Sequence, residues 1–171
     1  MSAALHRLSL PGPMLRRGFW LYVWRVDTGA QTLLYVGRTG DNSSPHATAP
    51  YTRMGQHLGK MPNQNALRRH LESKGITPED CARFDLVAHG PIYDQVPHDT
   101  DDRTVLMQRH IPLRDQVGAM EKLLCDGLKA AGYNVMNSVN CRWTLDAEGL
   151  EKWQAAIAAF QSEFPDFGKV M

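Results

Sequence analysis

The chain has 171 residues, of which 43% are hydrophobic, and its formal net charge is +1. This length predicts one globular domain with an ordinary core, and no apolar run approaches the ~20 residues of a membrane-spanning helix. The three cysteines (Cys81, Cys125 and Cys141) show neither CxxC nor metal-ligand spacing, a pattern typical of free thiols in a reducing compartment. We therefore expect a cytoplasmic protein.

The first 17 residues differ from the rest. Two prolines interrupt the short apolar stretch in MSAALHRLSLPGPMLRRG, which argues against a signal peptide and favours an N-terminal arm or strap over 1–17. We expect residues 18–171 to form a single domain, with a core over 19–139 and a C-terminal helical extension over 140–171.

A β-hairpin is predicted first. Aromatic and β-branched residues indicate a strand over Phe19–Val26, Asp27-Thr28-Gly29-Ala30 supplies the turn, and a second strand follows over Thr32–Val36. The segment 37–50, GRTGDNSSPHATAP, is rich in Gly, Ser, Asn and Pro, which indicates a long loop of the kind that often carries function.

Helical patterns dominate the rest of the chain. We expect helices over Tyr51–Leu58 and Ala66–Ser73, then a third strand over Phe84–His89 that ends at Gly90-Pro91. A long helix follows from Thr104 to Gly132, with a break at Pro112 left open, and 133–139 is a candidate short strand. Leu150, Trp153, Ile157 and Phe160 lie at helical spacing and predict an amphipathic C-terminal helix over Leu145–Phe160. The fold class is α+β, with a small antiparallel sheet of about three strands flanked by helices.

Charge is unevenly distributed along the sequence. From Gly29 to Leu71 the only acidic residue is Asp41, whereas 72–102 contains eight acidic residues against Lys74 and Arg83. A segregated basic segment is expected of a face that binds phosphate, although a solvated charged surface would give the same pattern. The basic residues of this segment, apart from three histidines, are Arg38, Arg53, Lys60, Arg68 and Arg69.

Glu121 is unusual because it falls on the apolar stripe of the long helix, four residues after Val117 and three before Leu124. A buried carboxylate needs a partner, because burying it alone costs several kcal/mol. The partner would be either an arginine or a cation, and Mg²⁺ often binds one carboxylate together with water and phosphate oxygens.

Arg53 and His57 are four residues apart and share one helix face. Arginine offers a planar charged fork suited to phosphate, and histidine can transfer a proton near neutral pH. Tyr22, Tyr35 and Arg38 would each be ordinary strand or turn residues if considered alone.

In combination and in this order, these groups resemble the GIY-YIG nuclease superfamily over about 19–137. Trp20-Leu21-Tyr22 occupies the place of the GIY motif, and Tyr35-Val36-Gly37 matches the second motif. Trp20 departs from the family glycine. The resemblance extends to Arg53 as the helical arginine, His57 as the residue four later and Glu121 as the metal-binding glutamate. For the terminal asparagine, both Asn134 and Asn137 are candidates.

The resemblance implies a metal-dependent endonuclease that hydrolyses DNA by the attack of water, with Mg²⁺ or Mn²⁺ on Glu121. Tyr22 would be the general base, with Arg38 and the metal ion favouring its phenolate and His57 relaying the proton. Tyr35 would position water or phosphate, and Arg38 and Arg53 would bind phosphate. Arg68 and Arg69 are expected to contact substrate, and RNA remains an alternative to DNA. A catalytically lapsed nucleic-acid-binding module and a partner-binding protein unrelated to nucleases are the competing interpretations, and the oligomeric state stays open, a dimer included.

Overall fold

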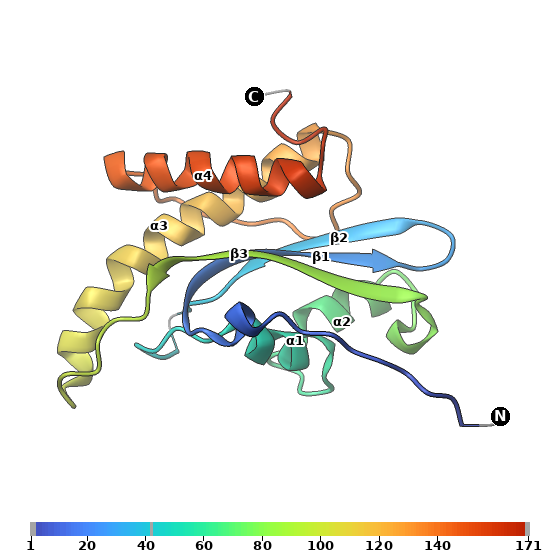
Figure 1. Cartoon of the computed structure of the whole chain (residues 1–171), viewed down its shortest axis with the longest axis horizontal. Coiled ribbons are helices and arrows are strands. Elements are labelled where there is room, and N and C mark those ends of the chain that lie inside the picture. Colours follow the sequence, from blue (N-terminus) through green and yellow to red (C-terminus); the bar gives the residue numbers. More distant parts are fainter. Residues whose placement is uncertain (1–2, 42, 170–171) are drawn as a thin grey trace.

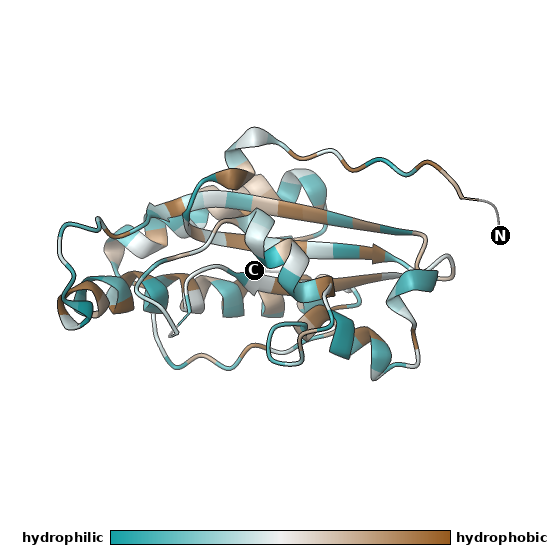
Figure 2. Ribbon diagram, turned by 90° about the horizontal axis from the view of Figure 1, so that it is seen from below, coloured by the Kyte–Doolittle hydropathy of each residue, from teal (hydrophilic) through white to brown (hydrophobic). Residues whose placement is uncertain are grey.

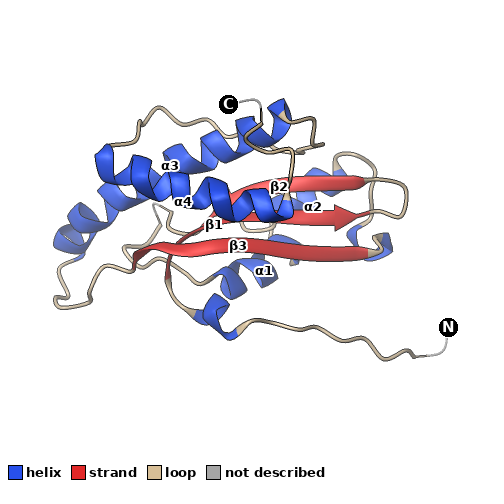
Figure 3. Ribbon diagram, turned by 45° about the horizontal axis from the view of Figure 1, so that its top comes forward, coloured by secondary structure: helices blue, strands red, loops and turns tan. Residues whose placement is uncertain are grey.

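The computed structural model describes residues 3–41 and 43–169. Three strands form one antiparallel sheet in the order β2-β1-β3, with helices on both faces (Figure 1 and Figure 3). This α+β arrangement confirms the predicted sheet of three strands flanked by helices. The strands are β1 (Gly18–Asp27), β2 (Thr32–Arg38) and β3 (Arg83–Asp94), and the helices are α1 (Pro50–Leu58), α2 (Ala66–Glu72), α3 (Arg103–Ala130) and α4 (Ala147–Glu163), with short 3₁₀ helices η1 (Gly12–Leu15) and η2 (Pro78–Asp80).

Helices α1 and α2 cover one face of the sheet, and α3 and α4 cover the other (Figure 1). The central strand β1 is therefore buried on both faces, which explains its run of apolar and aromatic residues. In Figure 2, hydrophobic (brown) segments recur along the strands of the sheet. Because side chains alternate along a strand, Leu21 and Val23 pack into the α3/α4 core, whereas Tyr22 and Trp24 pack into the α1/α2 core.

The third strand was predicted wrongly to end at Gly90-Pro91, because β3 continues to Asp94. As an edge strand, β3 has a side without a strand partner, where proline is tolerated. Opposite it, the pairing with β1 shifts register between Phe19 and Leu21. A side chain on Gly90 would meet the Trp20 ring at 2.9 Å, so glycine lets the two strands approach here.

The helices differ from the prediction in detail. Helix α3 runs without interruption through Pro112, and its first turn is capped by Asp102, whose carboxylate accepts from the backbone N–H of Thr104. The segment after α3 forms only an isolated parallel bridge, Leu34 to Val135, instead of a strand. Leu150 was predicted wrongly to face the core, since it is 52% exposed.

The N-terminal arm is extended up to η1, where Met14 is buried. Arg17 anchors its end through a hydrogen bond from Nε to the carbonyl oxygen of Ala47 at 3.1 Å. The beginning of the described arm extends away from the sheet and helices (Figure 1). None of the described helices combines the length and the apolar character that crossing a membrane requires.

Candidate active site

Tyr22 and His57 form a buried hydrogen-bonded pair between β1 and α1. Tyr22 Oη lies 2.7 Å from His57 Nε2, and both residues are about 1% exposed. Opposite Tyr22 in the strand register is Gly37, where a Cβ would lie 2.6 Å from Tyr22 Oη. Glycine at this position therefore makes room for the phenol, which gives the last residue of the Tyr-Val-Gly motif a steric role.

Both members of the pair are held in their neutral forms. Burial raises the pKa of Tyr22 to about 12, against an opposing effect from the charge and hydrogen bonding of Arg53. Burial, together with the charge of Arg53, lowers the pKa of His57 to about 3. In the tautomer that carries its proton on Nδ1, neutral imidazole accepts at Nε2, so Tyr22 can donate to it while its oxygen keeps a lone pair for another donor.

Tyr35 lies next to the same histidine but makes only ring contacts with it. Its ring centroid is 5.2 Å from that of His57 and 5.5 Å from that of His70. Burial raises the pKa of Tyr35, and the neighbouring Tyr22 raises it further. Tyr35 is therefore a neutral hydrogen-bonding group beside the Tyr22–His57 pair.

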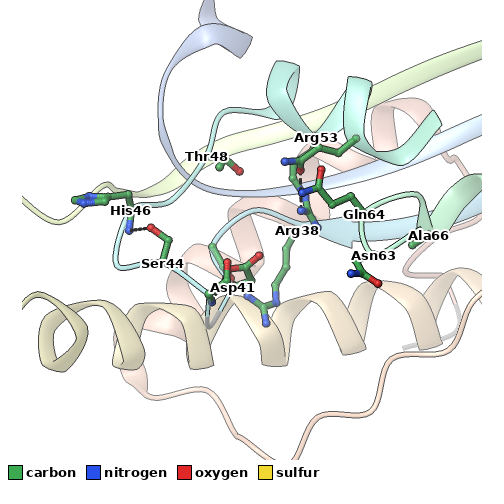
Figure 4. Close-up of a pocket in the computed structure, with 12 residues that line it drawn as sticks. Arg38, Asp41, Ser44, His46, Thr48, Arg53, Asn63, Gln64 and Ala66 are labelled. Carbon is green, nitrogen blue, oxygen red and sulfur yellow. Dashed lines mark hydrogen bonds between the residues drawn. The ribbon is translucent and has the colours of Figure 1, made fainter. Parts of the chain in front are cut away.

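Arg53 and Arg38 line one pocket of about 360 Å³. Figure 4 shows Arg53 entering from α1 and Arg38 from the end of β2, with Gln64 beside Arg53. Arg53 donates from a terminal nitrogen to Gln56 Oε1 at 2.9 Å, but its buried Nε has no partner in the described part of the chain. An unpaired buried N–H is costly, so an acceptor brought within reach of this nitrogen would be bound favourably.

Glu121 forms an ion pair with Arg38, in which Arg38 Nε lies 3.0 Å from Glu121 Oε2. Both side chains are mostly buried, with 19% and 17% exposed. Burial raises the pKa of Glu121, against the lowering effect of Arg38 and then Arg53. Arg38 also donates to the carbonyl oxygen of Gly40, which ties the start of the loop to the ion pair.

The predicted residues therefore come together in two groups, one on each side of the sheet. Tyr22, Tyr35, His57 and Arg53 lie with α1 and α2, whereas Glu121 belongs to α3 on the opposite face. The two groups approach each other at the end of β2, where Arg38 contacts Glu121 and shares the pocket with Arg53. The negative charge of Glu121 also acts on both tyrosines, raising their pKa values.

The two candidate asparagines have different positions. The Asn137 side chain bonds the backbone of Val36 twice, accepting from its N–H at 3.0 Å and donating to its carbonyl oxygen at 2.8 Å. Asn137 thus fixes the strand between Tyr35 and Arg38. Asn134 is exposed and bonds Gln31 in the hairpin turn, at the other end of β2 from Arg38.

The arginines of α2 lie outside the pocket lining. Arg68 is paired with Glu79 at 2.7 Å and with Glu72 at 3.4 Å, so its charge is largely engaged within the fold. Arg69 is exposed, and its charge lowers the pKa of Tyr35 against the larger effect of burial. Of the two, Arg69 has the charge available for a ligand.

Sequence reasoning assigned no role to Asp41, which lines the pocket with the two arginines. Burial raises the pKa of Asp41, but hydrogen bonds from Ser43 and the charges of Arg53 and Arg38 lower it overall. Its carboxylate is therefore ionised in the pocket. The available signal was its status as the single acidic residue of the basic segment.

No protein-family model, curated protein sequence or solved structure matches this chain.

Proposed function

We propose that this protein is a metal-dependent endonuclease that hydrolyses phosphodiester bonds of DNA, with a fold of the GIY-YIG type. The observation that carries the proposal is the pocket with two arginines, one of them with an unpaired buried Nε, beside a tyrosine–histidine pair and a buried glutamate. Together these groups provide cationic phosphate binding, a proton path and a site for a hard cation.

The scissile phosphate would bind in the pocket between Arg53 and Arg38. The Arg53 guanidinium would donate to a non-bridging oxygen and its positive charge would stabilise the charge that develops there. Arg38 is oriented by Glu121, so its side chain is held in the lining of the same pocket. The pocket volume of about 360 Å³ is sufficient for a phosphate group and several waters.

Tyr22 and His57 would remove the proton of the attacking water. Tyr22 would accept this proton at Oη as it passes its own proton to His57 Nε2, over the existing 2.7 Å bond. The cations that we expected to favour a phenolate do not outweigh burial, because the Tyr22 pKa is about 12 and the His57 pKa about 3. Proton transfer would therefore accompany the attack of water instead of preceding it.

Glu121 is the residue that would hold a divalent ion. Its carboxylate is mostly buried, and burial keeps its pKa raised even with Arg38 paired to it at 3.0 Å, so a further cation beside it would be favourable. Across 3–41 and 43–169 there is no group of three His, Cys, Asp or Glu side chains arranged for a metal. Glu121 would be the carboxylate ligand, together with water and phosphate oxygens, a mode that suits Mg²⁺ or Mn²⁺. When bound, the ion would offset charge on the leaving 3′ oxygen.

Plasmid nicking tests this function. The wild-type protein should nick supercoiled DNA with Mg²⁺ and stop when a chelator is added. Arg53→Ala and Glu121→Ala should each reduce the rate at least about 100-fold, as expected for the loss of an electrostatic contact to the transition state. Arg83→Ala is the matched control, since Arg83 is an exposed arginine paired with Asp85 on β3. Full activity of both site variants would refute the assignment.

One observation favours a second candidate, a nucleic-acid-binding module whose catalysis has lapsed. Tyr22 is only 1% exposed, so water must reach its hydroxyl through a change in the surrounding side chains. DNA binding that weakens steeply with salt, without any cleavage in Mg²⁺ or Mn²⁺, would favour this candidate over the enzyme.

A further inference from the structure

A second basic surface lies on α3 and on the segment that joins α3 to α4. It is an open cavity of about 610 Å³, hereafter the tryptophan pocket, lined by Arg114, Lys122, Asn140, Cys141, Arg142 and Trp143. Three of these six residues are cationic and none is acidic. Neither the sequence motifs nor the proposed hydrolytic site assigns it a role.

The tryptophan pocket adjoins the proposed catalytic site through Gly118. A Cβ on Gly118 would lie 3.6 Å from Arg38 Nε and 3.7 Å from the ring of Trp143. The guanidinium of Arg38 and the indole of Trp143 therefore both lie beside Gly118 of α3. A DNA strand held at Arg38 would pass directly from the Glu121 side of the site into the tryptophan pocket.

Trp143 is the chemically distinctive group of this surface. Trp20, Trp24 and Trp153 are at most 5% exposed, whereas Trp143 is half-buried and lines the cavity. The guanidinium carbons of Arg114 and Arg142 lie over this ring, 4.9 and 5.7 Å from its centroid, so a stacking base would displace one of them, and Arg142 is the exposed one. An accessible indole among cations is the arrangement on which unpaired nucleobases stack in single-strand-binding proteins.

The charges of the tryptophan pocket differ in availability. Arg114 is paired with Asp115, and Lys122 with Asp126. Arg142 is exposed, and none of the described carboxylates pairs with it. Arg142 is therefore the cation that can neutralise a phosphate without first giving up an ion pair.

The position of Trp143 is fixed by the segment that carries it. Gln116 on α3 accepts from the backbone N–H of Asp146 at 3.1 Å and donates to the carbonyl oxygen of Thr144 at 3.4 Å. These bonds hold the segment against α3, which places residues 140–143 beside the helix (Figure 1). The surface is thus preorganised, which reduces the entropy lost on binding.

We infer that the tryptophan pocket binds one unpaired nucleotide of the substrate, next to the cleaved phosphate, by stacking its base on Trp143 and contacting a phosphate with Arg142. The inference rests on the proposed function, because that function places the DNA strand at Arg38, beside the tryptophan pocket. It narrows the substrate class to DNA that is single-stranded or unpaired beside the cleavage site. Asn140 lines the same pocket and can donate to or accept from a base edge.

Tryptophan fluorescence tests the stacking directly, because Trp143 is the one tryptophan that a ligand can reach. The wild-type chain is titrated in EDTA, which prevents cleavage, with a short single-stranded oligodeoxynucleotide and with the same sequence as a duplex. Partial quenching is expected with the single strand and much less with the duplex. Trp143→Phe should abolish the quenching but bind as the wild type does, because the aromatic ring is kept.

Two further variants separate stacking from charge. Trp143→Ala should weaken binding of the single strand roughly 5- to 100-fold, the range for loss of one base–aromatic stack. Arg142→Gln should lower the slope of log affinity against log salt by about 1, as expected for one phosphate contact. Arg83→Gln, which removes an exposed arginine elsewhere, should leave that slope unchanged.

Three results would each overturn the inference. They are wild-type affinity of Trp143→Ala for the single strand, equal quenching by single strand and duplex, and equal effects of Arg142→Gln and Arg83→Gln on the salt slope. If such a result came with intact plasmid nicking, the proposed role of the tryptophan pocket would be refuted and the proposed nuclease function would remain supported. Quenching and weakened Trp143→Ala binding without any cleavage would support the pocket and refute the enzyme. The absence of all nucleic-acid binding would refute both.

Discussion

The Arg38–Glu121 ion pair gives the sharpest stability prediction. Replacing Arg38 with Met keeps much of the side-chain volume but leaves the Glu121 carboxylate, 17% exposed, without its cation. Removing one partner of a fully buried pair costs 3–5 kcal/mol. With the remaining exposure of Glu121 taken into account, we expect the free energy of unfolding to fall by about 2–3 kcal/mol at pH 8.

The cost should depend on pH with a defined sign. The folded-state pKa of Glu121 is already raised by burial, and losing Arg38 raises it further. A carboxyl group whose folded pKa lies above its unfolded pKa loses stability as the pH rises through that window, so the variant should recover stability on acidification from pH 8 to pH 5. Chemical denaturation of wild type and Arg38→Met at both pH values gives the difference.

Adding Glu121→Gln to Arg38→Met should remove this pH dependence and recover part of the lost stability, since no buried charge then remains. A cost that is independent of pH, or a double variant whose cost is the sum of the two single variants, would refute the view that these side chains act as a coupled pair.

Three other predictions concern the groups around β2. Gly37→Ala should lower the free energy of unfolding by about 1–3 kcal/mol and disturb the Tyr22–His57 bond, because the new Cβ would lie 2.6 Å from Tyr22 Oη. The control Gly55→Ala, whose Cβ meets nothing within 4 Å, should be neutral or stabilising by up to about 1 kcal/mol in thermal denaturation. Equal effects of the two substitutions would contradict the steric account. Asn137→Ala should lower the free energy of unfolding by about 2–4 kcal/mol, since it leaves both backbone groups of Val36 unpaired. Asn134→Ala should lower it by less than about 0.5 kcal/mol. The reverse order of the two effects would contradict the placement of these asparagines. Because the His57 pKa is lowered to about 3, its contribution to stability is lost as the pH falls below about 6.5. Between pH 7 and pH 5, the free energy of unfolding of His57→Gln should therefore fall by roughly 2 kcal/mol less than that of the wild type in urea denaturation. Equal losses in the two proteins would contradict a buried neutral histidine.

The hairpin and the helices of this fold could be predicted because their signals are local. The apolar run of β1, the turn at 27–31 and the helical spacing of α4 each depend on neighbouring residues. The end of β3 could not be predicted, because Pro91 is acceptable only on an edge strand, and strand order is a property of the whole sheet. Pro112 inside α3 is a similar case, since tertiary packing outweighs a local helix breaker there.

For the candidate site, the sequence named most of the residues that meet, but not how they are paired. It also named Asn134, Arg68 and Arg69, which lie outside the pocket lining. The register that sets Tyr22 opposite Gly37 explains why the tyrosine can reach His57. The choice of Arg38 as the partner of Glu121 joins two segments 83 residues apart, which no local pattern encodes. The nearness of Trp143 to Arg38 likewise depends on the return of the chain after α3 and on the small Gly118.

The most direct test of the central claim is the rate of DNA nicking by Tyr22→Phe in Mg²⁺, measured on protein shown to be folded by circular dichroism. This variant removes a single oxygen and keeps the ring packing of β1. If the Tyr22–His57 pair removes the proton of the attacking water, the rate should fall about 10²- to 10⁴-fold, with DNA affinity unchanged. A Tyr22→Phe rate within about threefold of the wild type, below any proton-transfer effect, would contradict the account.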